Sequence, residues 1–179
     1  MSNPYTGTVA SALRKAQLLL QSSAEVDDTP LLEASLLEAA VLQLWRGYRG
    51  FLAEQGYQMQ LGFAAGAEPQ TAQALANLVA QRGKFSGEAS ELVNLAENPD
   101  SWFAGLFAAW HKLWVLSASG SSGHAQSTTS VGVQSMIPVR QLDSAEVAPE
   151  QALTRERVQQ WHRSLSELIQ RQRAHSQEW

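Results

Sequence analysis

The stretch Thr29–Gly56, TPLLEASLLEAAVLQLWRGYRGFLAEQG, decides the fold of this chain of 179 residues. Thr29 is typical of a helix N-cap, and Pro30 suits the first helical position, where its missing N–H costs nothing. Apolar residues then recur at helical spacing, and Gly56 is expected to end the helix. The main apolar stripe consists of Ala34, Leu37, Val41, Leu44, Tyr48 and Phe51. Because a second apolar row widens this stripe, the sequence predicts a central helix with neighbours on more than one face.

Two glycines stand inside this predicted helix. Gly47 and Gly50 each cost up to about 1 kcal/mol relative to alanine in a helix interior. Their presence predicts either the close approach of another backbone or a kink.

Amphipathic patterns predict further helices on both sides of the central one. They cover residues 6–22, 69–82, 86–98, 101–117 and 150–174. Residues 57–67 fit either an extra helical turn or a short extended piece. No strand pattern is sustained, so the expected fold is an all-α, single-domain bundle of five or six helices.

Residues 117–135 are rich in Ser, Gly and Thr, which is the composition of a flexible linker. The predicted organisation is therefore a helical bundle at 1–116, a flexible linker at 117–138 and a C-terminal helix within 139–179. That helix is expected to dock through Trp161 on the bundle or on a second copy of the chain.

The composition excludes several classes of function. There is no cysteine, which excludes disulfides and thiolate metal sites, and the net charge of −4 argues against a DNA-binding protein. No apolar run approaches the roughly 20 residues of a membrane-spanning helix, and no targeting segment is evident. We therefore expect a cytoplasmic protein with no membrane, metal or cofactor.

The predicted helix at 101–117 carries an aromatic stripe. Trp110, His111 and Trp114 are candidates for lining an apolar ligand pocket, since such pockets combine rings with a few polar groups. The interpretation that we favour is a core helix, because burial demands the same spacing. His111 has no second ligand at metal-binding spacing, so a metal site is not expected.

Arg157 and His162 form an R-x4-H motif that resembles the catalytic motif of HEPN ribonucleases. The resemblance implies a helical dimer in which His162 is the general acid/base and Arg157 stabilises the phosphate of an RNA substrate. Val158 departs from the polar residue usual in that family. The five-residue separation also turns the two side chains about 140° apart on a straight helix. We favour a solvated helix face for this motif and for the neighbouring arginines, which alternate with glutamates.

Two longer segments carry a broader resemblance. They are Leu37–Leu44 leading to Tyr48–Glu54, and Asn98–Phe103 leading to Trp110. Together they resemble an uncharacterised family of small helical bacterial proteins, known only as a domain of unknown function. The resemblance implies an all-α bundle in the cytosol, and it assigns no role to any residue.

The leading hypothesis from the sequence is a non-enzymatic binding or scaffold protein. Its partner is expected to be another protein or a second copy of the chain, as in a homodimer. The two alternatives are the metal-independent ribonuclease, which alone would bind RNA, and a bundle that holds a small apolar ligand.

Overall fold

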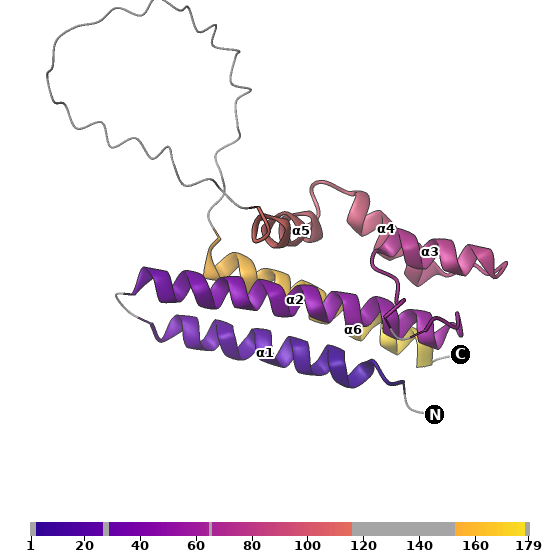
Figure 1. The fold of residues 1–179 in the computed structure, drawn as a ribbon, viewed down its shortest axis with the longest axis horizontal. Coiled ribbons are helices and arrows are strands. Elements are labelled where there is room, and N and C mark those ends of the chain that lie inside the picture. Colours follow the sequence, from indigo (N-terminus) through magenta and orange to yellow (C-terminus); the bar gives the residue numbers. More distant parts are fainter. Residues whose placement is uncertain (1–2, 27–28, 65, 116–152, 178–179) are drawn as a thin grey trace, which may run out of the picture. The chain divides into compact units, whose positions relative to one another are not determined.

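The computed structural model describes residues 3–26, 29–64, 66–115 and 153–177 (Figure 1). Within these ranges 76% of the residues are helical and no strand is present. The helices are α1 (Thr6–Ala24), α2 (Pro30–Gln58), α3 (Ala72–Gln81), α4 (Gly87–Glu97), α5 (Trp102–Lys112) and α6 (Arg155–Gln177). The predicted all-α bundle of five or six helices is confirmed.

Helix α2 is the centre of the described bundle. It contacts α1, α3, α5 and α6, and α6 also contacts α1 and α5. Figure 1 shows α1 alongside α2 on one side, with α3, α4 and α5 on the other. The prediction that the helix beginning at Pro30 has neighbours on several faces is confirmed.

Helices α1 and α2 pack closely because small residues face each other. A Cβ atom on Gly50 would lie 3.2 Å from Val9 Cγ2, and one on Gly47 would lie 3.6 Å from Ala12 Cβ. Val9, Ala12 and Ala16 of α1 are buried. The two glycines of α2 therefore allow α1 to approach closely. Of the two explanations predicted from the sequence, a close approach or a kink, the structure shows the close approach.

The end of α2 differs from the sequence prediction. The helix continues through Gly56 to Gln58. A Cβ atom on Gly56 would lie 2.5 Å from Phe63 Cε1, so glycine is needed here to admit a ring from the following segment. Gly56 is thus a packing residue and not a helix end.

The three short helices begin at capping side chains. Thr71, Ser86 and Ser101 accept hydrogen bonds from the backbone N–H groups of Ala74, Ala89 and Ala104. Such caps satisfy one of the free N–H groups in a first helical turn. The prediction that α3 begins at Pro69 is wrong by three residues, because Thr71 supplies the cap.

Helix α6 buries one face against the other helices of the chain. Its buried apolar residues are Val158, Trp161, Leu165, Leu168 and Ile169. The Trp161 ring lies on α5, where its Cζ2 atom is 3.1 Å from the Cβ position of Gly105. The predicted linker at 117–138 lies outside the described residues. The domain boundaries and an exchange of α6 with a second copy therefore remain predictions.

The arginines of α6 are not all solvated, which corrects the sequence interpretation. Arg155 Nη2 lies 2.7 Å from Glu33 Oε1 of α2, and Arg173 Nη2 lies 2.7 Å from Glu54 Oε2 of the same helix; each arginine side chain is only 28% exposed. These pairs join α6 to another helix, and contacts of that kind leave no trace in the spacing within one helix.

Candidate functional site

An aromatic cluster joins α5 to the middle of α2. The rings of Trp45 and Trp110 are stacked with centroids 4.2 Å apart, and Phe107 lies 5.6 Å from Trp45. Deeper in the bundle, the Tyr48 and Phe103 rings are 4.5 Å apart. The predicted aromatic stripe therefore supplies part of the core, with Phe103 and Leu106 as its buried members.

The outer side of this cluster is exposed. Side chains of Phe107, Trp114 and Val115 are 45%, 63% and 56% exposed, and Trp110 is half-buried behind them. These four residues, with His111, are called the aromatic edge below. Exposed rings of this size are more typical of an interaction surface than of a finished core.

Two basic residues lie at the aromatic edge. His111 and Lys112 are exposed in the last turn of α5, where cations interact favourably with the helix dipole. The His111 ring centroid lies 6.3 Å from that of Phe107. The Trp110 ring stacks on Trp45, and the His111 ring lies beside Phe107. The role of Trp110, His111 and Trp114 in binding a ligand remains a prediction.

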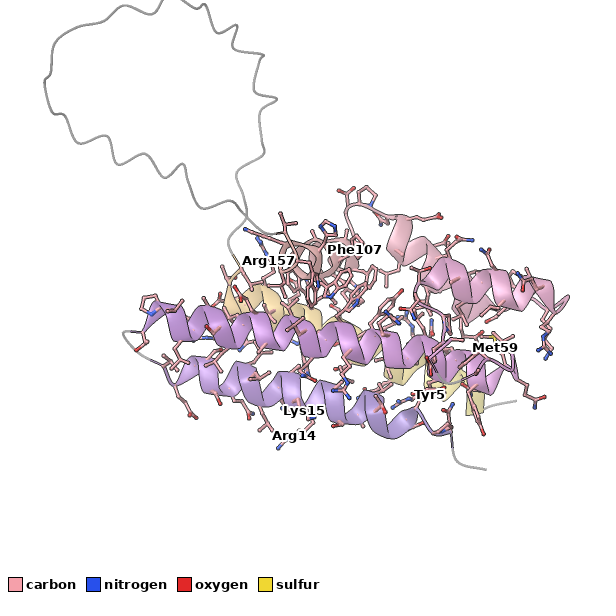
Figure 2. The ribbon with its side chains drawn as sticks, in the orientation of Figure 1. Tyr5, Arg14, Lys15, Met59, Phe107 and Arg157 are labelled. Atoms are coloured by element: carbon pink, nitrogen blue, oxygen red, sulfur yellow. The ribbon has the colours of Figure 1, made fainter. Side chains whose placement is uncertain are left out.

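The structure places Arg157 and His162 in different surroundings. His162 is half-buried, and its Nε2–H donates to the Leu13 backbone oxygen of α1 at 3.1 Å. It helps to line a groove of about 510 Å³ between α1 and α6, whereas Arg157 does not line that groove. Arg157 lies in the first turn of α6 (Figure 2). Their roles in a ribonuclease site remain predictions.

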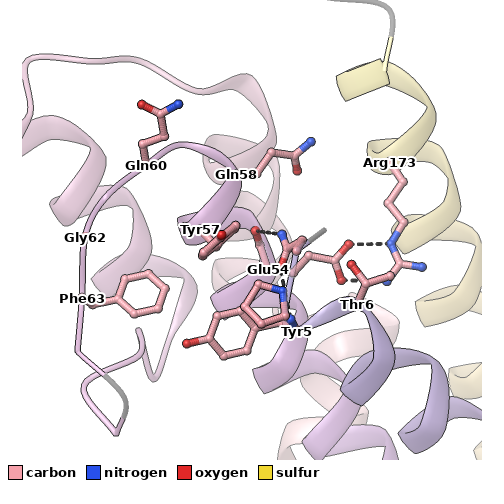
Figure 3. Close-up of a pocket in the computed structure, with 11 residues that line it drawn as sticks. Tyr5, Thr6, Glu54, Tyr57, Gln58, Gln60, Gly62, Phe63 and Arg173 are labelled. Carbon is pink, nitrogen blue, oxygen red and sulfur yellow. Dashed lines mark hydrogen bonds and ion pairs between the residues drawn. The ribbon is translucent and has the colours of Figure 1, made fainter. Parts of the chain in front are cut away.

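A cleft that the sequence did not reveal lies at the opposite end of α2 (Figure 3). Its volume is about 860 Å³, and its walls come from the start of α1, the end of α2, the segment after α2, and α6. The lining residues are Asn3, Pro4, Tyr5, Thr6, Glu54, Tyr57, Gln58, Gln60, Gly62, Phe63 and Arg173. Residues 57–63 show no regular period, which is why the pattern of the sequence could not predict this cleft.

A buried ion pair forms one wall of the cleft. Arg173 donates from Nε and from Nη2 to the two carboxylate oxygens of Glu54, each at 2.7 Å. Asn3 Nδ2 donates to the backbone oxygen of Glu54 at 2.9 Å. The Glu54 side chain is only 5% exposed. The charges at this wall are therefore paired, and the chain termini of the described bundle are held together there.

Tyr5 forms the aromatic wall of the cleft. Its ring lies 6.4 Å from that of Tyr57 and 6.1 Å from that of Phe63, and its hydroxyl donates to Glu68 Oε1 at 3.2 Å. Burial, followed by the bond to Glu68, raises the pKa of Tyr5. Backbone hydrogen bonds from Gly66 and Glu68 itself lower the pKa of the Glu68 carboxyl. Both shifts keep Tyr5 as the donor and Glu68 as the acceptor near neutral pH.

The model of the Family of unknown function (DUF6586) matches residues 4–179. The chain belongs to this family. The resemblance found in the sequence to a family of unknown function with an all-helical fold is thereby confirmed. No curated protein and no solved structure matches the chain.

Membership of DUF6586 assigns no activity, so the geometry alone must carry a functional argument. Among the described residues, no helix is long and apolar enough to cross a membrane. Within the same ranges, no three side chains of His, Cys, Asp or Glu form a group that could hold a metal ion.

Proposed function

We propose that the chain is a non-enzymatic binding protein whose aromatic edge docks an amphipathic, acidic segment of a partner protein. The observation that carries the proposal is the exposure of Phe107, Trp114 and Val115 over the stacked Trp45–Trp110 pair. Large aromatic side chains are enriched at the centres of protein interfaces and contribute much of their binding energy.

The rings of the aromatic edge are partly fixed before any partner arrives. Trp110 stacks on Trp45 at 4.2 Å, and Phe107 packs beside both of them. Binding a rigid surface loses less side-chain entropy than ordering a mobile one. This supports docking on the outer side of the cluster.

The charge around the edge favours an acidic partner. His111 and Lys112 are exposed in the same turn as the rings, and they would face carboxylates on a complementary segment. A second copy of the chain docked through the same edge would bring like charges together. Self-association through this surface is therefore less favourable than binding an acidic partner. The crosslinking experiment below distinguishes the two.

Two other functions are less well supported. A pocket for a small apolar ligand needs space between rings, but the rings of Trp45, Phe107 and Trp110 contact each other. A ribonuclease needs His162 and Arg157 at one RNA phosphate, but His162 is bound to the Leu13 backbone and only His162 lines the α1–α6 groove.

Site-specific photo-crosslinking in the native cell tests the proposal. A photoreactive phenylalanine analogue replaces Trp114 or Phe107 at the edge. In the control it replaces Phe85, which is 86% exposed but lies in the connection between α3 and α4. We expect crosslinks from positions 114 and 107 to one protein with an acidic, amphipathic segment, and none to that protein from position 85.

Each other outcome would change the conclusion. Crosslinks from 114 and 107 to a second copy alone would replace the partner by a homodimer. Equal labelling from all three positions, or none from the edge, would remove the aromatic edge as a docking surface. Binding of the captured partner should also weaken at least tenfold when Trp114→Glu introduces a charge at the edge.

A further inference from the structure

A small polar hollow lies between α1 and α2, and it shares no lining residue with the aromatic edge or with the cleft at Tyr5. Its volume is about 200 Å³, and it is lined by Gly7, Thr8, Ser11, Ala12, Lys15, Gln43 and Arg46. The α1 members recur every three or four residues, so they share one face of that helix. Gly7, Thr8, Ser11 and Ala12 have side chains of at most two carbon atoms, so the space between them and α2 stays open.

The polar groups of this hollow lack partners within the protein. In the described part of the chain, Lys15 and Arg46 make no hydrogen bond or ion pair, and the same holds for the hydroxyls of Thr8 and Ser11. Gln43 adds a side-chain oxygen, Oε1, that is buried and has no hydrogen-bond partner. A buried acceptor without a donor is costly, so Gln43 Oε1 would gain from a donor that a bound molecule supplies.

Both charged residues that line the hollow, Lys15 and Arg46, are cations, although the whole chain carries a net charge of −4. Helix α1 contains Arg14 and Lys15 but no Asp or Glu. Helix α2 contains Arg46 and Arg49, and it has no carboxylate between Glu38 and Glu54. Cations that are gathered on a surface without carboxylates raise the local concentration of anions.

We infer that this hollow binds a protonated phosphate, either inorganic phosphate or the phosphate group of a small ester. Lys15 and Arg46 would supply charge-assisted hydrogen bonds, and the hydroxyls of Thr8 and Ser11 would donate to the remaining oxygens. The P–OH group would donate to Gln43 Oε1 and so satisfy the buried acceptor. Sulfate has the same shape but no proton near neutral pH, so the hollow should prefer phosphate.

The size of the hollow limits the ligand. A space of about 200 Å³ holds one phosphate group with a small substituent, but not a nucleotide. Lys15 and Arg46 come from different helices, and Figure 2 shows Lys15 beside Arg14 on α1. Arg14 instead donates to Gln17 Oε1 at 2.9 Å and does not line the hollow. The chain thus offers a matched control that differs from Lys15 by one position.

Calorimetric titration of the full chain with inorganic phosphate at pH 7 and constant ionic strength tests the inference. We expect Lys15→Ala and Arg46→Ala each to weaken binding about tenfold, because each removes a charge-assisted bond. Arg14→Ala and Arg163→Ala remove the same charge elsewhere on the exposed surface and should change the affinity less than about twofold at physiological salt.

Two further variants separate a built site from general attraction. Ser11→Met fills the hollow without changing the charge, and it should abolish phosphate binding while leaving the thermal midpoint unchanged, since Ser11 is exposed. Gln43→Leu removes the acceptor and should remove the preference for phosphate over sulfate.

Several results would overturn the inference. Equal losses from Lys15→Ala and Arg14→Ala, or equal affinity of the wild type for sulfate and phosphate, would show a diffuse charge effect. Binding to a 12-nucleotide RNA or to vesicles of anionic lipid without binding to inorganic phosphate would assign the cations to a macromolecular surface instead.

Discussion

Helix α2 packs against two of its neighbours, α1 and α5, in opposite ways. Against α1 it presents Gly47 and Gly50, whose Cβ positions lie 3.6 Å from Ala12 Cβ and 3.2 Å from Val9 Cγ2. Against α5 it presents Trp45 and Tyr48 to a set of rings. Both surfaces are apolar, but the first is closed and the second continues outward into the exposed aromatic edge. An apolar helical stripe therefore does not by itself reveal whether it ends inside the protein or on its surface.

The largest expected effect tests the inner part of the α5 interface. Phe103→Ala should reduce the free energy of unfolding by about 3–5 kcal/mol, because Phe103 is only 4% exposed and its ring packs on Tyr48. Urea denaturation measures this change. Phe107→Ala is the matched control, and it should cost less than about 1 kcal/mol because Phe107 is 45% exposed. Equal costs would mean that the aromatic edge is covered in solution.

An intermediate effect is expected where the cluster meets the surface. Trp110→Ala should reduce the free energy of unfolding by about 2–3 kcal/mol, since Trp110 is half-buried but stacks on Trp45. The same denaturation experiment measures it, with Trp45→Ala and the double variant completing a cycle. A coupling energy near zero between the two positions would contradict the stacked arrangement.

The close interface should be sensitive to added volume. Gly50→Leu should cost about 1–3 kcal/mol, because even its Cβ would stand 3.2 Å from Val9 Cγ2. Thermal unfolding followed by circular dichroism detects this loss. At Gly7 a Cβ atom would meet nothing within 4 Å, so Gly7→Leu should leave the midpoint unchanged or raise it. A tolerated Gly50→Leu would show that α1 can move away from α2.

The smallest effect has the opposite sign. Gly47→Ala should stabilise the protein by about 0.5–1 kcal/mol, because alanine favours a helix interior and its Cβ would make ordinary contacts at 3.6 Å. Gly50→Ala should lack this gain, since its Cβ lies closer to Val9. Denaturation of the two variants side by side measures the difference. Equal stabilisation would mean that both glycines have the same room.

The sequence predicted the number, order and type of the helices, because their apolar residues repeat at the helical period. From the low helix propensity of Gly47 and Gly50 it predicted either a close approach or a kink, and the structure shows the close approach. It could not predict the role of Gly56, since the ring that needs its space belongs to Phe63 in an irregular segment. The spacing of residues within a helix therefore predicts local structure, but it does not predict which residues from distant segments will meet.

The candidate sites show this limit most clearly. Trp110, His111 and Trp114 became candidates because they lie close together on a predicted helix, and their role in binding a ligand is still a prediction. The Tyr5 cleft was missed because its walls come from four segments that only folding brings together. The hollow beside Lys15 was missed because α1 and α2 each contribute only part of it. A period within one helix carries no information about the residues opposite it.

The ion pairs of α6 have a consequence for the order of folding events. Arg155 reaches Glu33 and Arg173 reaches Glu54 across 122 and 119 positions of the chain. A ribosome must add residues 116–152 before it begins α6, which takes a few seconds at about 5–20 residues per second. During that interval the surface that later receives Trp161 and Leu165 stands uncovered on the nascent chain. The newly made protein therefore passes through a timed period of vulnerability to aggregation, which ends only when α6 arrives.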